Sequence, residues 1–441
     1  MNERILISGA SIAGLTLAHW LARHGFRPTV VERAPALRLG GNGVDVRDHA
    51  VTVVERMGLM SRVRELGTDV RGMKFVDAAD RAVARIDTQD PASTEIMRGD
   101  LVALLREVTD AEIVLGDSIR GLEQDDDGVT ATFERAPARR FDLVVGADGM
   151  HSNVRRIAFG PEEKYIAFKN HYFAFANTDA ALGEDRWVTM FNTPGTMTGI
   201  YRSGNHAQAK AYFMFRSAPL DYDRRDVTEH KRLVGKAFAG KESWRTRELL
   251  DSALTDPDFY FDALGQVRMD SWSNGRVVLV GDAAWCASPA SGAGAELALV
   301  GAYRLAGELA AAGGDHRVAF PRYDAAHRPL VDNKQQIGPN VRLMVPKTEG
   351  GRCVRDLVAR LPLMKVIGTV ERRIQARKAR PLPHYTRVAA SRSGKRRQAA
   401  SGGDGGGEEQ PERGRPEPRH GHRRYGRRSN SAEEPRIRPG E

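Results

Sequence analysis

Three glycine-rich segments of this 441-residue chain have charged side chains beside them and could together bind a nucleotide. The first motif, residues 9–14, reads Gly-Ala-Ser-Ile-Ala-Gly and follows an apolar run that predicts a strand. Glycine allows a tight turn there, and the next helix directs free N–H groups and the positive end of its dipole at a phosphate. Gly9, Ser11 and Gly14 are therefore candidates for a dinucleotide pyrophosphate site, although serine replaces the usual middle glycine.

An acid follows this motif at the spacing that a ribose contact requires. A predicted strand, Thr-Val-Val over residues 29–31, ends at Glu32, with Arg33 next to it. A carboxylate about 20 residues after the glycine turn typically bonds a ribose hydroxyl. Glu32 and Arg33 are predicted to join the site, and a glycine-bearing turn that holds no ligand is the alternative.

Two further motifs also follow apolar runs that predict buried strands. The second, residues 146–155, starts Gly-Ala-Asp-Gly, and the third, residues 281–294, starts Gly-Asp-Ala-Ala and ends Gly-Ala-Gly. Ligands of doubly wound sheets bind outside the carboxyl ends of the strands. All three motifs are therefore expected at one edge of one sheet.

In this order, the motifs resemble those of the FAD-dependent aromatic hydroxylases. That family is typified by para-hydroxybenzoate hydroxylase, and the chain is most similar in its motifs to the tetracycline-inactivating branch. The resemblance implies a monooxygenase that binds FAD and uses NADPH or NADH with O2. It would hydroxylate an aromatic or polyketide-like molecule through a flavin C4a-hydroperoxide, and no catalytic side chain is expected because the flavin carries the chemistry.

The resemblance also implies roles for individual residues. Arg38 and Arg155 match positions associated with the nicotinamide cofactor, and Asp148 matches one associated with placing FAD. The remaining matches to FAD-contacting positions are Gly9, Ser11, Gly14, Glu32, Asp45, Arg98, Asp282, Pro289, Gly292 and Gly294. Two residues depart from the pattern: Trp285 stands where many relatives have histidine, and Glu296 places an acid beside the last turn.

The elements around the motifs predict an α/β protein: a Rossmann-like FAD-binding domain with an inserted, mostly antiparallel β-sheet substrate domain, C-terminal helices and a disordered tail. Helices are expected over residues 226–255, about 294–312 and most of 317–380, with a break at Pro329 among others. The expected domains are 1–71, 98–164 and 271–345 for FAD, 72–97 and 165–270 for substrate, 346–386 as a helical segment, and 387–441 as the tail.

Aromatic residues are concentrated in the predicted inserted sheet. Their rings suit a flat aromatic or polycyclic ligand but could equally fill the sheet's own core. The candidates for the substrate site are Phe173, Phe175, Tyr201, Tyr212 and Phe215.

Composition limits the other classes of function. The net charge is +10, but residues 387–441 hold 14 Arg and Lys against 8 Asp and Glu, so most of the excess lies in the tail. Two cysteines give no disulfide framework, and no apolar run is long enough to span a membrane. We expect a cytoplasmic monomer or homodimer with no nucleic-acid or membrane partner and no metal.

Three alternatives remain at the level of sequence. An FAD-dependent reductase or dehydrogenase would share the fold and differ in not needing O2. A flavin-dependent halogenase would need two tryptophans spaced two apart, and none of the five tryptophans is so placed. Binding of RNA or another anion by the basic tail would be a different class of function, and the tail has few aromatic residues for stacking.

Overall fold

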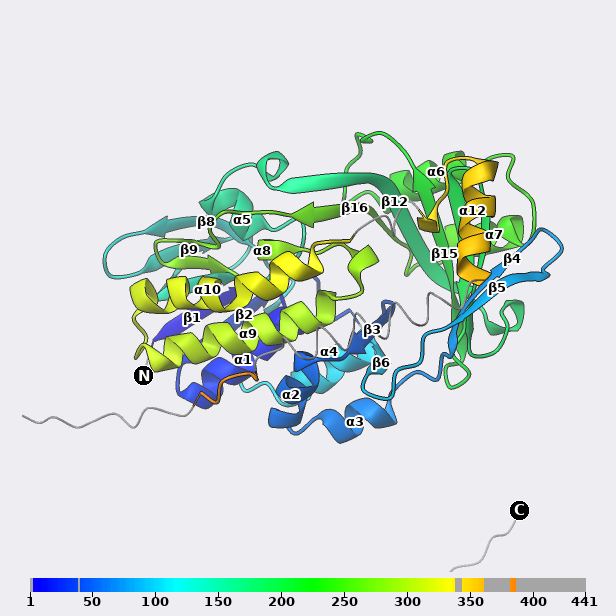
Figure 1. Ribbon diagram of the computed structural model, residues 1–441. Helices are drawn as coiled ribbons and strands as arrows, with labels where there is room; N and C mark the ends of the chain where they lie inside the picture. The colour runs from blue at the N-terminus through cyan, green and yellow to red at the C-terminus, as the bar shows by residue number, and fades with distance from the viewer. Residues whose placement is uncertain (1–2, 39, 338–342, 361–380, 386–441) are drawn as a thin grey trace, which may run out of the picture. The chain divides into compact units, whose positions relative to one another are not determined.

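The computed structural model describes residues 3–38, 40–337, 343–360 and 381–385. They form two large β-sheets joined by helices (Figure 1). The predicted tail, residues 387–441, lies outside the described residues, as does the part of the predicted helical segment between 361 and 380.

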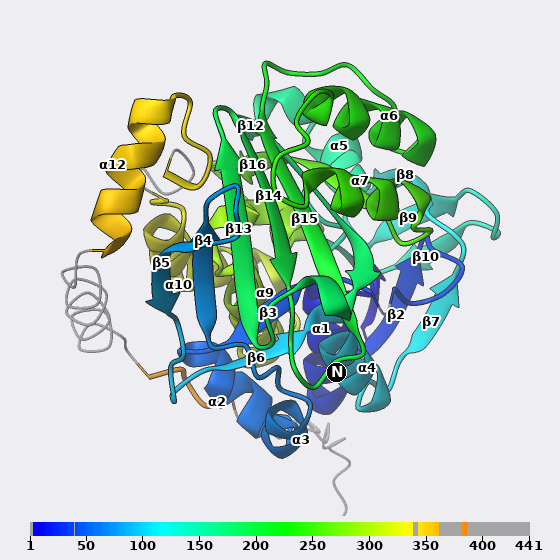
Figure 2. The same cartoon turned by 90° about the vertical axis from the view of Figure 1, so that its right-hand side faces the viewer.

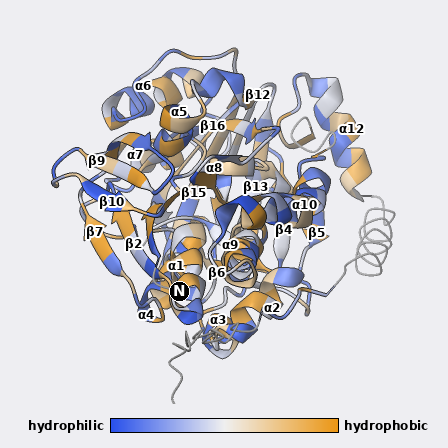
Figure 3. Ribbon diagram, turned by 90° about the vertical axis from the view of Figure 1, so that its left-hand side faces the viewer, coloured by the Kyte–Doolittle hydropathy of each residue, from blue (hydrophilic) through white to orange (hydrophobic). Residues whose placement is uncertain are grey.

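A six-stranded sheet has the order β17-β18-β11-β1-β2-β7. All its pairs are parallel except β17 with β18. Its central strands are continuous apolar runs because helices cover them, and α1, α9 and α10 lie side by side there (Figure 1; Figure 3 shows the hydrophobic residues). The strands are β1 Arg4–Ser8, β2 Arg27–Glu32, β7 Glu112–Leu115, β11 Leu143–Gly146, β17 Ser273–Asn274 and β18 Val277–Leu279.

A seven-stranded sheet has the order β16-β12-β15-β14-β13-β4-β5 and is antiparallel except where β13 pairs with β4. Helices α6 and α7 pack on its outer face (Figure 2). Its strands are β4 Gly72–Val76, β5 Ala82–Asp87, β12 Ile166–Asp179, β13 Trp187–Thr193, β14 Thr196–Tyr201, β15 Gln208–Arg216 and β16 Tyr260–Val267.

Two small antiparallel sheets and the helices complete the described chain. The strands are β8 Ile119–Gln124, β9 Val129–Phe133 and β10 Arg139–Phe141 in one sheet, and β3 Gly43–Val46 and β6 Thr94–Met97 in the other. The α-helices are α1 Ile12–His24, α2 His49–Arg56, α3 Met60–Glu65, α4 Arg98–Glu107, α5 Asn153–Ala158, α6 Val227–Phe238, α7 Thr246–Thr255, α8 Asp282–Trp285, α9 Gly294–Ala311, α10 His316–Lys334 and α12 Glu349–Arg360.

The predicted fold class is confirmed, including the parallel sheet and the mostly antiparallel inserted sheet. The break predicted at Pro329 is wrong, because α10 continues through this proline to Lys334. A proline inside a helix removes one hydrogen bond. Burial of Tyr323, His327 and Val331 on one side of α10 offsets that loss.

Among the described residues, no helix combines the length and apolar character that crossing a membrane requires. Within this same part of the chain, no group of three or more His, Cys, Asp and Glu side chains is arranged to bind a metal ion.

A substitution at Gly14 would test whether α1 has to pack this closely against the end of β1. A Cβ at this position would lie 1.9 Å from the carbonyl oxygen of Gly9, which is backbone and cannot rotate away. We expect Gly14→Ala to lower the free energy of unfolding by about 3 kcal/mol or more, measured by urea titration.

Gly235 is the matched control, since it is also inside a helix. Its Cβ would meet nothing nearer than the Leu254 side chain at 3.9 Å. Gly235→Ala should therefore raise stability by up to about 1 kcal/mol. Equal stability of the two variants would contradict the close approach.

Candidate functional site

The first motif turns at the carboxyl end of β1 and contacts both neighbouring strands. Gly9 has φ +107°, and its N–H donates to the Val31 carbonyl oxygen over 2.7 Å. A Cβ on Gly9 would lie 2.5 Å from the carbonyl oxygen of Ala147, a residue of the second motif. Only glycine fits this backbone crossing.

Glu32 lies at the end of β2 and is bonded directly to the first motif. Its carboxylate accepts from the Ala10 N–H and the Ala34 N–H, both over 2.9 Å. A carboxylate has about four lone-pair positions, so further acceptor capacity remains. The neighbouring Arg33 is exposed.

Arg98 begins α4 and joins the first motif to the loop before β3. Its guanidinium donates to Ser11 Oγ over 2.8 Å and to the Gly40 carbonyl oxygen over 3.5 Å. Burial lowers the pKa of Arg98, and the charges of Asp282 and Glu32 oppose that shift. Two predicted residues, Ser11 and Arg98, therefore meet, and the predicted Arg38 lies near enough for its charge to act on Arg98.

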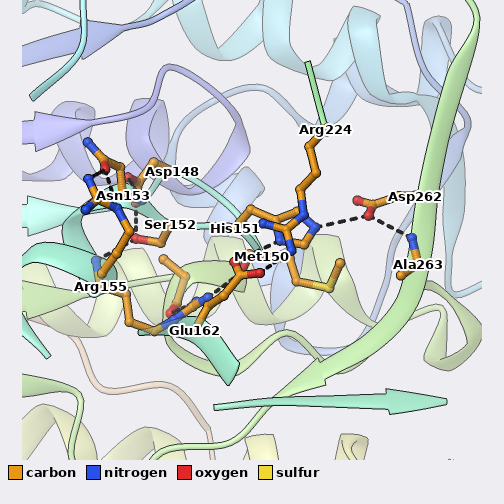
Figure 4. A network of polar contacts seen from close by, with 12 residues as sticks. Asp148, Met150, His151, Ser152, Asn153, Arg155, Glu162, Arg224, Asp262 and Ala263 are labelled. Atoms are coloured by element: carbon orange, nitrogen blue, oxygen red, sulfur yellow. Dashed lines mark hydrogen bonds and ion pairs between the residues drawn. The ribbon is translucent and has the colours of Figure 1, made fainter. Parts of the chain in front are cut away.

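The second motif is fixed by its own acid. Asp148 accepts from the N–H groups of Asn153 and Val154 over 2.8 and 3.1 Å, and from the Ser152 hydroxyl (Figure 4). These bonds satisfy free N–H groups at the start of α5. The structure thus gives Asp148 a role in holding its loop, next to the role in placing FAD that remains a prediction.

Arg155 connects the second motif to the third. The side chain is fully buried and donates to the carbonyl oxygens of Ala283, over 2.9 Å, and Met150. In this position it presents no surface to a cofactor. The predicted contact with a nicotinamide cofactor would require Arg155 to leave these carbonyl partners.

The third motif places Asp282 where a ligand can reach it. The carboxylate is exposed, yet burial by the surrounding protein raises its pKa, while the charge of Arg98 lowers it. After Pro289, which is also exposed, Gly292 turns with φ +59° and accepts from Arg47 over 2.9 Å, and Gly294 starts α9.

Trp285, in the same motif, is a packing residue. It is fully buried, and its ring lies 4.6 Å, centroid to centroid, from the rings of both Trp272 and His327.

The predicted substrate aromatics divide between the two faces of the seven-stranded sheet. Ring contacts connect Phe173, Phe175, Tyr201 and Tyr212 on one face, together with Tyr260. We call these five residues the aromatic face. Tyr260 is connected through Asp262 to His151 of the second motif, so this face lies beside that motif.

Phe215 does not belong to the aromatic face, and its prediction as a substrate residue is wrong. It packs in the opposite core under α6, against Tyr172, Phe238 and Phe261. The reason is the two-residue period of a strand, which sends Phe215 and Tyr212 to opposite sides of β15.

Tyr260 is joined to a polar network that the sequence did not reveal. Its hydroxyl donates to Asp262 over 3.0 Å. Asp262 in turn lies 3.1 Å from His151 of the second motif (Figure 4). The other ring nitrogen of His151 lies 3.1 Å from Glu162, which also pairs with Arg224. Strand β16 was not among the predicted strands, although Tyr260 and Asp262 show the alternation that places both on one face.

Asp45 also has an unpredicted partner. It lies directly opposite Glu95 in the β3–β6 pair, and burial raises the pKa of both carboxyls. Glu95 accepts from Thr68 over 2.6 Å and from Tyr201 of the aromatic face over 3.1 Å. The predicted loop residue Asp45 is thus connected to the aromatic face.

A family model described as an FAD binding domain matches residues 3–320. The chain belongs to this family of flavin-dependent monooxygenases. It is 37% identical over 343 residues to a flavin-dependent monooxygenase of Legionella longbeachae, covering 76% of this chain and 88% of the relative. It is 43% identical over 342 residues to an uncharacterized protein of Mycobacterium tuberculosis, covering 76% and 92%.

Solved structures agree with this membership. Tetracycline destructase Tet(51) superposes with a TM-score of 0.75 at 32% identity, covering 87% of this chain and all of that one. Tetracycline destructase Tet(55) superposes with a TM-score of 0.70 at 35% identity, covering 81% of this chain and 95% of that one. The predicted resemblance to FAD-dependent hydroxylases is confirmed.

His151 should make stability depend on pH. Burial disfavours the charged ring, but hydrogen bonds with Asp262 and Glu162 outweigh it and raise the pKa of His151. The stabilisation is complete below about pH 6.5, the value for a free histidine, and is lost as pH rises through the folded pKa.

The check is the difference in unfolding free energy between the protein and His151→Gln, in which other titrating groups cancel. It should be larger at pH 5.5 than at pH 9 by about 1.5–3 kcal/mol, the range for a hydrogen bond to a charged group. A difference that does not change with pH would show that His151 stays neutral.

Proposed function

We propose that this monooxygenase uses FAD, NADPH or NADH, and O2 to hydroxylate an aromatic or polyketide-like small molecule. The observation that supports this most is the contact of the aromatic face with the motifs. Tyr260 donates to Asp262 over 3.0 Å, and Asp262 lies 3.1 Å from His151 of the second motif. A redox cofactor and a flat substrate held there would lie next to each other.

The residues at the first motif and its neighbours fit the ADP part of FAD. The turn at Gly9, Ser11 and Gly14 would bring the start of α1 to the pyrophosphate. Glu32 has acceptor capacity left for ribose hydroxyls, and Arg98, already bonded to Ser11, places a cation there.

The third motif fits the flavin part. Asp282 is exposed and could accept hydrogen bonds from hydroxyl groups. Gly292 and Gly294 are also exposed, at the start of α9. Asp45, Arg38, Arg33 and Pro289 complete the proposed set. When bound, FAD would supply the redox chemistry by accepting a hydride and activating O2.

We propose that Asp148 and Arg155 act one step away from the cofactor. Asp148 holds the second motif against α5, and Arg155 holds it to the third. The protein's part in the reaction is then to orient the substrate and keep water away from the flavin.

The substrate would lie on the aromatic face. Phe173, Phe175, Tyr201 and Tyr212 remain the proposed contacts, and Tyr260 is added to them. The likeness to two tetracycline destructases supports a polycyclic ligand. Tyr201 and Tyr260 already donate their hydroxyls to carboxylates, so each oxygen keeps a lone pair for a substrate hydroxyl.

The proposal is tested on the purified protein. It should be yellow, and under nitrogen NADPH or NADH should bleach it faster when a phenol, a naphthoquinone or a tetracycline is added. Admission of ¹⁸O₂ should give a product with one labelled oxygen. A product that forms without O2 would assign a reductase or dehydrogenase, and a colourless protein that FAD cannot reconstitute would reject the function.

Tyr212 and Phe213 are adjacent on β15 and point to opposite faces of the sheet, so substitutions at these two positions test the faces separately. Tyr212→Ala should weaken binding of the probe that stimulates reduction by about fivefold, since loss of one aromatic contact costs about 1 kcal/mol. The readout is the probe-induced change in flavin absorbance.

Phe213→Ala is the matched control because Phe213 packs in the core under α6. It should lower unfolding free energy by about 3–5 kcal/mol and leave probe affinity of the folded protein near its original value. The opposite pattern would mean that the substrate face has been assigned to the wrong side.

A further inference from the structure

A buried ion pair lies at the start of α9. Glu296 is in the first turn of this helix and is 1% exposed, and its Oε2 is 2.7 Å from Lys334 Nζ at the end of α10. Lys334 is also 3.2 Å from Asp48. A buried carboxylate is costly without a cation, so Lys334 is what allows Glu296 to be charged there.

The pair also directs Glu296 away from the helix end. An acid at the third position of a helix commonly folds back to the N–H of the capping residue. Here the capping N–H, that of Ala293, donates to Ser291 Oγ over 3.2 Å instead. Glu296 Oε1 has no hydrogen-bond partner among the described residues.

The other charges beside the pair come from Arg47, Asp45 and Asp48. Arg47 binds the Gly292 carbonyl oxygen of the same turn and lies 3.6 Å from Asp45. Arg47 and Asp45 oppose each other, and Asp48 has a 56% exposed side chain, so that water screens its charge. The charge at this helix end therefore depends mainly on whether Lys334 balances Glu296. The positive end of the α9 dipole adds to it.

We propose that Glu296 and Lys334 are positioning residues that set the charge at the start of α9 and so adjust how tightly oxidised and reduced FAD are held. This inference rests on the proposed function, which places the flavin part of FAD at the third motif. Reduced flavin in its anionic form is favoured by positive charge nearby, and an unbalanced carboxylate opposes it.

The experiment measures the reduction potential of bound FAD at pH 8.5 by equilibration with a reference dye. Lys334→Met should lower the affinity for reduced relative to oxidised FAD about tenfold, which is about 30 mV for a two-electron couple. Glu296→Gln should raise the potential. The double variant should return close to the original value, because it removes both charges.

Lys74→Met is the matched control. Lys74 is also buried and pairs with Glu184 over 2.6 Å, but in the seven-stranded sheet on β4. It should lower stability without changing the potential. Unchanged potentials in Lys334→Met and Glu296→Gln, or an equal shift in Lys74→Met, would overturn the inference. Failure of the unmodified protein to bind FAD would instead reject the proposed function.

Discussion

The close contact of backbone with backbone at the carboxyl edge of the parallel sheet is the constraint on which the site depends. Side chains are excluded where Gly9 crosses the end of β11 and where Gly14 crosses Gly9. Parallel strands bring their carboxyl ends to one edge, so three motifs far apart in sequence become neighbours there. The buried Arg155 then bonds the second motif to the third and fixes their separation.

The inserted sheet has two faces with different surroundings. One face packs in a hydrophobic core, and the other is the proposed ligand surface. Antiparallel strands do this through their two-residue period. Tyr172, Phe213 and Phe261 pack with α6 and α7, whereas their neighbours Phe173, Tyr212 and Tyr260 point to the other face. One run of aromatic residues therefore supplies both a packed core and the proposed binding surface.

The sequence predicted the local parts of this arrangement well. Glycine turns after apolar runs identified the three motifs, since tight turns and close packing leave a direct trace in residue type. It could not divide the aromatic residues between faces, because the register of a strand depends on its partners. For this reason the sequence predicts Phe215 at the substrate site, although it packs in the core, and does not indicate Tyr260 as a member of the aromatic face.

Long-range charge pairs were also beyond local patterns. Glu296 looked like an acid out of place, and only the fold shows that Lys334 of the next helix compensates it. Arg47 binds the Gly292 turn across 245 positions in sequence. Nothing near either residue in the chain indicates its partner. A local motif therefore predicts the role of a glycine in a turn more reliably than the role of a charged side chain, whose partner can lie far away in the sequence.

Residues 381–385 pack against two helices, α2 and α9, and again a glycine allows the close contact. The ring of Tyr385 lies where Gly307 of α9 has no side chain, and its hydroxyl donates to Glu308 over 2.7 Å. Arg56 of α2 donates to the Leu382 and Pro383 carbonyl oxygens over 3.2 and 2.8 Å. This segment has no helix or strand, but two contacts hold it. The absence of a side chain at Gly307 makes room for the Tyr385 ring, and the Arg56 guanidinium donates to two backbone carbonyls. The segment therefore stabilises α2 and α9, the two helices that carry or adjoin the charged groups at the third motif.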